Sequence, residues 1–258
     1  MVLLPGWAVS AYTYRHQLPA LAAVGYRAIA VDLKGHGFAD KPCGRGEYTL
    51  PAMLRHAREV VEAVARGPTV LIAQSMAAPL AVELARERDT IAELVLISPV
   101  GLGVIPFIGL ARLLTPRLLD PIAPYLAPRW LVRFALGRVF GNSARLTEDI
   151  VEEYWAPAQF PGFARTLRAL VHDFAWSPVP DTRLAPLVRR TLVVLGSRDR
   201  VLRGAPDHAA RVFGPNVVVV PDGGHAVNEE YPEPVNDAIV RFLGRPARGE
   251  VGLTAADR

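Results

Sequence analysis

Residues 72–85, IAQSMAAPLAVELA, decide the fold that this sequence predicts. The apolar run TVLIA at 69–73 leads into Ser75 as a buried strand would, and beyond Pro79 the pattern is helical. A tight turn between strand and helix would expose the hydroxyl of Ser75 and direct the helix N-terminus at any negative charge that develops there. Such turns usually read Gly-x-Ser-x-Gly, whereas this one reads AQSMA at 73–77. The stretch therefore predicts a nucleophile whose flanking glycines are replaced by alanines.

On both sides of this stretch, short apolar runs alternate with helical patterns. The runs predict buried strands at 2–4, 27–32, 69–73, 93–98, 189–199 and 216–220. The patterns between them predict helices at 12–25, 50–67, 78–89, 205–213 and 232–244. Strands that are regularly separated by helices indicate an α/β fold, in which a mostly parallel sheet is covered by helices on both faces.

The strand signals disappear between residues 103 and 185, where prolines and helical stripes such as RWLVRFALGRVF take their place. We expect these residues to form a helical cap inserted into the sheet domain. Residues 1–102 and 186–245 are then the core, and 246–258 are predicted to be a flexible polar tail.

Three polar residues follow predicted strands, at the edge of the sheet where ligands usually bind in such folds. Ser75 follows TVLIA, Asp199 follows TLVVLGSR, and His225 follows NVVVVPDGG, whose glycines allow a sharp bend. A serine hydroxyl is a weak nucleophile that needs an imidazole as general base, and the imidazole needs a carboxylate to fix its tautomer. Each residue alone could be a helix cap or a loop residue, but together they predict a catalytic triad.

Composition excludes several other classes of protein. The 258 residues carry a net charge of +4, but the positive charges are scattered without a binding motif, so we expect no nucleic-acid partner. The single cysteine, Cys43, excludes internal disulfides and cysteine-rich metal clusters, so we expect no metal and no cofactor. The N-terminus lacks the pattern of a signal peptide, and the uncharged run 94–111 is interrupted by prolines and glycines. These features favour a cytoplasmic protein without a membrane span.

Several motifs resemble those of the α/β-hydrolase superfamily, in its capped branch that includes epoxide hydrolases and esterases. The resemblance spans nearly the whole chain and rests on LLPGWAVSAYTYRHQLPAL at 3–21, VDLKGHGFADKP at 31–42, AQSMAA at 73–78, LGSRD at 195–199 and GGHAVNEEYPEPV at 223–235. It implies Ser75 as nucleophile, His225 as general base and Asp199 as the orienting acid. It also implies an oxyanion hole formed by the backbone N–H groups of Trp7 and Met76. His36, in the second motif, is expected to be structural.

The chain departs from the family pattern at several points. Ala73 and Ala77 replace the glycines beside the nucleophile, and Pro5 replaces the histidine that usually precedes Gly6. The chain also starts almost at the oxyanion loop, so the sheet should lack the first antiparallel edge pair, unless the start given is too late. Because residue 75 is Ser rather than Asp, the epoxide-hydrolase and haloalkane-dehalogenase branches are disfavoured.

The resemblance therefore favours hydrolysis of an ester-like or C–C bond through an acyl-enzyme, as in carboxylesterases and lipases. A non-catalytic ligand-binding homologue and an acyltransferase with the same triad stay open as alternatives. We expect a small acyl or ester substrate held by apolar residues of the cap, namely Phe107, Leu110, Leu114, Trp130 and Phe134. Residues 104–140 also carry five arginines against one acid, which allows a weak contact with a membrane surface.

Overall fold

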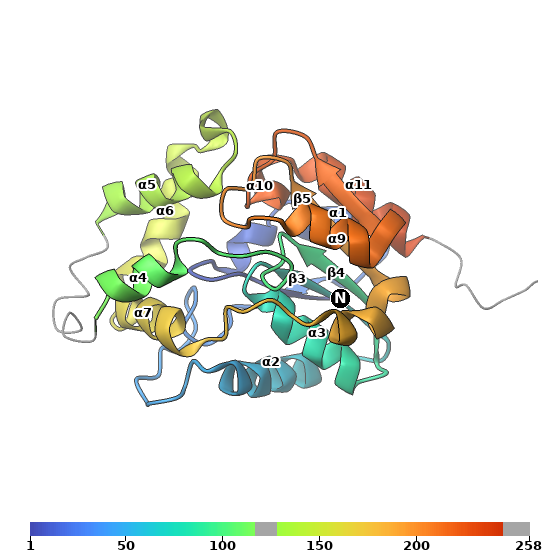
Figure 1. Cartoon of the computed structure of the whole chain (residues 1–258), viewed down its shortest axis with the longest axis horizontal. Coiled ribbons are helices and arrows are strands. Elements are labelled where there is room, and N and C mark those ends of the chain that lie inside the picture. Colours follow the sequence, from blue (N-terminus) through green and yellow to red (C-terminus); the bar gives the residue numbers. More distant parts are fainter. Residues whose placement is uncertain (117–127, 245–258) are drawn as a thin grey trace, which may run out of the picture.

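The fold is built on one parallel sheet, as a computed structural model that describes residues 1–116 and 128–244 shows (Figure 1). Its six strands lie in the order β2-β1-β3-β4-β5-β6, and every pairing between neighbours is parallel. The strands are β1 (Val2–Leu4), β2 (Ile29–Ala30), β3 (Thr69–Gln74), β4 (Ile91–Ile97), β5 (Thr191–Gly196) and β6 (Val217–Val220). The α/β fold predicted from the alternation is confirmed, with a sheet that is wholly parallel in the described part.

Helices of the core follow the strands and cover both faces of the sheet. The core helices are α1 (Gln17–Ala23), α2 (Leu50–Val64), α3 (Ala77–Glu87), α9 (Ala205–Phe213), α10 (Val227–Glu230) and α11 (Pro232–Leu243). Short 3₁₀ helices are η1 (Ala11–Tyr14), η6 (Ala185–Arg190) and η7 (Gly214–Asn216). The predicted helix at 12–25 is thus divided into η1 and α1. Pro19 explains the division. If the α-helix began earlier in the chain, the carbonyl four residues before Pro19 would clash with the proline ring.

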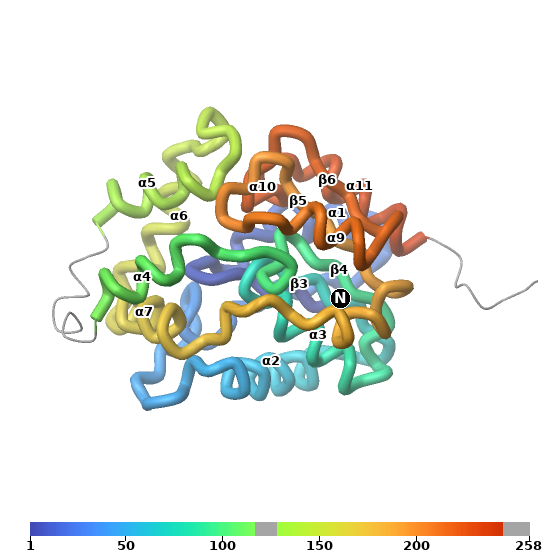
Figure 2. The backbone as a smooth tube through the Cα atoms, viewed as in Figure 1, coloured from blue at the N-terminus to red at the C-terminus, as the bar shows by residue number. Residues whose placement is uncertain are grey.

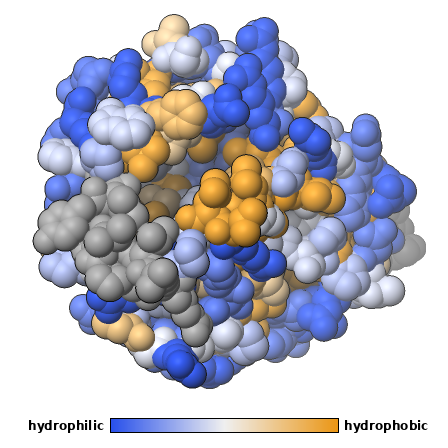
Figure 3. All heavy atoms as spheres, turned by 60° about the vertical axis from the view of Figure 1, so that its left-hand side comes forward, coloured by the Kyte–Doolittle hydropathy of each residue, from blue (hydrophilic) through white to orange (hydrophobic). Residues whose placement is uncertain are grey.

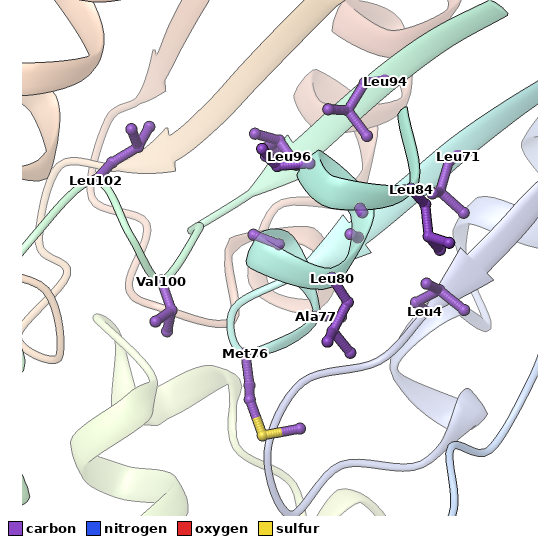
Figure 4. Close-up of a cluster of buried hydrophobic side chains, with 14 of the residues drawn as sticks. Leu4, Leu71, Met76, Ala77, Leu80, Leu84, Leu94, Leu96, Val100 and Leu102 are labelled. Carbon is purple, nitrogen blue, oxygen red and sulfur yellow. The ribbon is translucent and has the colours of Figure 1, made fainter. Parts of the chain in front are cut away.

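Two apolar clusters lie on opposite faces of the sheet. On one face, α2, α3 and α9 pack against the strands, and Figure 4 shows Leu84 of α3 beside Leu71 of β3. On the other face, α1 and α11 bury Leu21, Ile239 and their neighbours against the strands. Burial on both faces explains why the strands are continuous apolar runs.

The predicted strand at 27–32 is shorter than expected, since only Ile29 and Ala30 pair with β1. Asp32 ends it, because its carboxylate accepts hydrogen bonds from the N–H groups of Ala11 (2.6 Å) and Phe38 (2.8 Å). These bonds draw the backbone out of the sheet and into a turn that places the loop after β1 next to the loop after β2.

Helices replace strands in the described part of the chain between β4 and β5. They are α4 (Ile108–Leu114), α5 (Arg129–Val139), α6 (Glu148–Trp155), α7 (Phe163–Asp173) and α8 (Asp181–Leu184), with η4 (Ser143–Arg145) and η5 (Ala156–Gln159). Helices α4 to α7 lie together at one end of the molecule in Figure 1, and we call residues 103–185 the cap. The tail predicted at 246–258 lies outside the described residues. In residues 1–116 and 128–244, no helix is long and apolar enough to cross a membrane.

Candidate active site

Ser75 occupies the sharp turn between β3 and α3. Its φ angle is +49°, a left-handed conformation that costs a non-glycine residue about 1–3 kcal/mol. Three backbone hydrogen bonds hold it there: its N–H donates to Ile97 O (2.9 Å), and its carbonyl accepts from the N–H groups of Ala78 (3.0 Å) and Val100 (3.1 Å). Ala73 lies in β3 and Ala77 begins α3, so both alanines have regular conformations. The strain of the turn therefore falls on Ser75, and the missing glycines are not needed for it.

Ser75, His225 and Asp199 form one hydrogen-bonded chain. Ser75 Oγ lies 2.8 Å from His225 Nε2, and His225 Nδ1 lies 2.8 Å from Asp199 Oδ2. An ionised carboxylate can only accept, so Nδ1 carries the ring proton and Nε2 is left free to accept from the serine hydroxyl. The side chains of His225 and Asp199 are only 8% and 5% exposed. The structure thus brings together the three residues that the sequence predicted.

The loop that carries His225 depends on close backbone contacts. A Cβ added to Gly196 at the end of β5 would lie 2.2 Å from the carbonyl oxygens of both Gly223 and Gly224. Only glycine at 196 therefore lets this loop lie close enough to β5 for His225 to reach Asp199. Asp222, the other carboxylate near His225, is instead exposed and ion-paired to Arg198 (2.6 Å).

The loop after β1 lies directly against the nucleophile. A Cβ added to Gly6 would be only 3.0 Å from Ser75 Cβ, so the small residue allows this approach. Trp7 follows Gly6, lines the same cavity as Ser75, and packs edge-on against Trp176 with ring centroids 6.1 Å apart. Met76 immediately precedes α3, where helical N–H groups have no partner within the helix. The backbones of Trp7 and Met76 therefore both lie beside Ser75.

An apolar cavity of about 460 Å³ lies between the cap and the ends of the strands. Ser75 and His225 are in its wall, together with Trp7, Val100 and Trp176. The cap contributes apolar side chains to it, among them Phe107, Ile108 and Ala111 near α4, Leu131, Ala135 and Leu136 of α5, and Phe163, Leu167 and Val171 of α7. The cavity can enclose a small, largely apolar molecule next to the serine hydroxyl.

Of the cap residues predicted to hold the substrate, only Phe107 lines this cavity. The prediction is wrong for Leu110, Leu114, Trp130 and Phe134, which are 57–69% exposed on the outer side of α4 and α5. Both helices carry apolar side chains on the face toward the cavity and also on the face away from it. Figure 3 shows this side of the molecule, where hydrophobic side chains gather between hydrophilic ones.

Glu229 is a polar residue of the cavity wall that the sequence reasoning missed. Its buried carboxylate accepts hydrogen bonds from Thr13 Oγ1 (2.9 Å) and from Tyr154 OH, and it pairs with Arg15 (2.5 Å). Burial, together with the charge of Glu229, raises the pKa of Tyr154 well above its usual value. Tyr154 comes from the cap, so this cluster joins the cap to the core. In the sequence, only the two adjacent glutamates at 229–230 could have indicated this cluster.

His36 is completely buried and lies outside the cavity wall. Its Nδ1 donates to Lys34 O (3.2 Å). Burial lowers the pKa of His36 to about 4. The structural role predicted for His36 agrees with this position.

The basic side chains of the cap are less free than the sequence suggested. Arg129 pairs with Glu148 and Glu152, and Arg133 also pairs with Glu148. These acids come from α6, beyond the segment whose charges were counted. Contact of the cap with a membrane surface stays a prediction. The ion pairs of Arg129 and Arg133 reduce the positive charge that could attract the cap to such a surface. In the described residues, no group of three or more His, Cys, Asp or Glu side chains could hold a metal ion.

Comparison with known proteins identifies the family. The model of the alpha/beta hydrolase family matches residues 1–238, so the chain belongs to that family. Epoxide hydrolase 3 of Xenopus tropicalis is 24% identical over 94% of this chain and 71% of its own length. The dihydrolipoyllysine-residue acetyltransferase component of the acetoin cleaving system of Pseudomonas putida is 28% identical over 94% of this chain and 63% of its own length.

Solved structures show the same fold. The meta-cleavage product hydrolase of Pseudomonas fluorescens IP01 superposes with a TM-score of 0.75 at 21% identity, over 94% of this chain and 89% of that one. At this identity the likeness establishes the fold alone. What this chain does has to be argued from its own site.

Proposed function

We propose that this protein is a cofactor-independent serine hydrolase, of carboxylesterase or lipase type, that cleaves an ester-like bond of a small, largely apolar substrate. The observation that carries the proposal is the continuous chain from Ser75 Oγ through His225 to Asp199, with 2.8 Å at each link and an apolar cavity at the serine. A buried chain of this kind makes a neutral serine reactive.

The geometry supports the following sequence of steps. His225 Nε2 takes the proton of Ser75 as Oγ attacks the substrate carbonyl. The backbone N–H groups of Trp7 and Met76, and the N-terminus of α3, would stabilise the resulting oxyanion. His225 then gives the proton to the leaving alkoxide, which departs and leaves an acyl ester on Ser75. Water activated by His225 hydrolyses this ester and releases the acid.

Several relatives are named epoxide hydrolases or haloalkane dehalogenases, but residue 75 of this chain points to a different bond. Attack of a serine hydroxyl on an epoxide or an alkyl halide would leave an alkyl ether on the enzyme. Water attacks such an ether far less readily than it attacks an acyl ester. A serine nucleophile therefore completes its cycle on carbonyl substrates, which include esters and the ketones cleaved in C–C hydrolysis.

Labelling with a fluorophosphonate probe tests the proposal. We expect wild-type protein to be labelled and the Ser75→Ala variant to stay unlabelled and to hydrolyse p-nitrophenyl butyrate at least about 10³-fold more slowly. Absence of labelling in a folded wild-type sample would instead identify a ligand-binding homologue without catalysis. Addition of alcohol or thiol acceptors to the ester assay would divert the acyl group if the protein were an acyltransferase.

A further inference from the structure

The end of α5 in the cap touches the loop that carries His225. The N–H of His225 donates to Val139 O, the last residue of α5, at 2.8 Å. Close by, a Cβ added to Gly141 would lie 2.6 Å from the backbone nitrogen of Gly224. Ala226 belongs to the apolar cluster of the cap, with Phe140 and Leu136. The two segments, far apart in sequence, lie side by side in Figure 2.

Glu230 joins these two segments. Its Oε1 accepts a hydrogen bond from Gly224 N–H (2.8 Å), on the histidine loop. Its Oε2 accepts from Gly141 N–H (2.8 Å) and Asn142 N–H (3.0 Å), in the cap. The residue is 0% exposed, and Arg145 of the cap donates to its backbone carbonyl (2.6 Å). Both oxygens of one carboxylate are therefore needed to hold the loop and the cap together.

Burial of an ionised carboxylate has a cost that such contacts must offset. Burial raises the pKa of Glu230, while the three backbone N–H groups oppose the rise. If the contact between loop and cap were only structural, nonpolar side chains could form it without the free-energy cost of desolvating a carboxylate. The buried carboxylate binds the N–H of Gly224, one residue before His225, whose imidazole the proposed chemistry needs in place, and this points to a role in positioning that imidazole.

We propose that Glu230 is a positioning residue, which fixes the imidazole of His225 between Ser75 and Asp199 by tying residues 141–142 of the cap to Gly224. The inference rests on the proposed function, since it assigns Glu230 a part in the same reaction. Glu230 lies outside the cavity wall, so it acts on the rate of the chemical step and leaves substrate binding unchanged. A displacement of about 1 Å in such a group can cost about 100-fold in rate.

The Glu230→Gln variant tests this role, with Glu233→Gln as the matched control on the exposed start of α11. Glutamine keeps the size of the side chain but offers one acceptor oxygen, so at least one of the two segments loses its partner. For hydrolysis of p-nitrophenyl butyrate, we expect kcat to fall about 10-fold or more and KM to change less than about twofold. The rate of fluorophosphonate labelling should fall with kcat, and Glu233→Gln should match wild type in both measurements.

Amide hydrogen exchange supplies a readout that does not depend on catalysis. We expect exchange at Gly224, or at Gly141 and Asn142, to accelerate in Glu230→Gln. Faster exchange with unchanged kcat would overturn the proposal, because the joint would then be structural only. Failure of wild type to react with the fluorophosphonate would overturn the proposed function instead, and unchanged exchange in Glu230→Gln would separately show that the carboxylate does not hold the loop.

Gly141→Ala tests the same joint if Glu230→Gln does not fold. Its φ is not positive, so alanine acts through the contact of its Cβ with the backbone of the histidine loop at residues 222–224. We expect kcat to fall about 10-fold with KM nearly constant. Gly137→Ala is the control, because a Cβ at that position of α5 meets nothing within 4 Å. Equal kcat values for the two glycine variants would contradict the proposal.

Discussion

Asp199 uses its two carboxylate oxygens for different purposes. Oδ2 accepts from His225 Nδ1, whereas Oδ1 accepts from the N–H groups of Val201 (2.8 Å) and Leu202 (3.1 Å). The second pair of bonds shapes the loop after β5 and fixes the direction of the carboxylate. A substitution that changes Oδ2 alone can therefore disturb the orientation of the imidazole and leave the fold of the loop intact.

The Asp199→Asn variant makes that separation. Its amide oxygen can keep the bonds to Val201 and Leu202, but its NH₂ group meets His225 and favours the tautomer that cannot accept from Ser75. We expect kcat for p-nitrophenyl butyrate to fall about 10⁴-fold, with the free energy of unfolding in urea changed by about 1 kcal/mol or less. Asp222→Asn, at the exposed carboxylate, should keep wild-type activity. Activity of Asp199→Asn within tenfold of wild type would show that the triad does not operate.

Among the elements, α4 and α5 separate the cavity from the surface. On α4, Ile108 and Ala111 line the cavity while Leu110 and Leu113 are exposed. On α5, the exposed residues Trp130 and Phe134 lie one turn apart on the outer side. Each helix is a thin wall with apolar side chains on both sides, which makes the inner face hard to recognise.

Substitutions on the two sides of this wall should have different effects. Phe107→Ala enlarges the cavity, so we expect kcat/KM for p-nitrophenyl octanoate relative to the butyrate to rise about 10-fold. Leu110→Ala, on the outer side three residues further on, should leave this ratio unchanged. Equal shifts in the two variants would mean that the cavity is not where the acyl chain binds.

The same two-sided pattern explains what the sequence could and could not predict. Buried parallel strands are continuous apolar runs, so all six strands and the three residues that follow them were predictable. Periodicity separates the faces of a helix only where one face is polar, so Leu114 and Phe134 were assigned to the wrong side. Glu229 and Glu230 meet partners more than 70 residues away in sequence, such as Tyr154 and Gly141, and no local pattern encodes such contacts.

For the molecule as a whole, the buried imidazole of His36 makes stability depend on pH. Its pKa is about 4 in the folded state because burial disfavours the charged form, against 6.5 when it is exposed. The unfolded chain therefore binds more protons between these values. Stability is full above about pH 6.5 and is lost as the pH falls toward 4.

Urea unfolding at two pH values measures this loss. Between pH 7 and pH 5, we expect His36 to lower the free energy of unfolding by about 2 kcal/mol. In His36→Gln, whose amide can still donate to Lys34 O but does not titrate, the decrease should be smaller by about that amount. The same decrease in both proteins would assign the pH dependence to other groups.

The contact between the end of α5 and the histidine loop also sets a limit on engineering. Designers who wish to alter selectivity could replace the whole insertion with that of another family member and retain the sheet. Such a chimera would exchange Val139 and Gly141 together with the substrate-facing helices, and the foreign backbone would meet the loop at an untested angle. Junctions that retain 139–142 with the host would let new specificity be transplanted without disturbing the machinery beneath it.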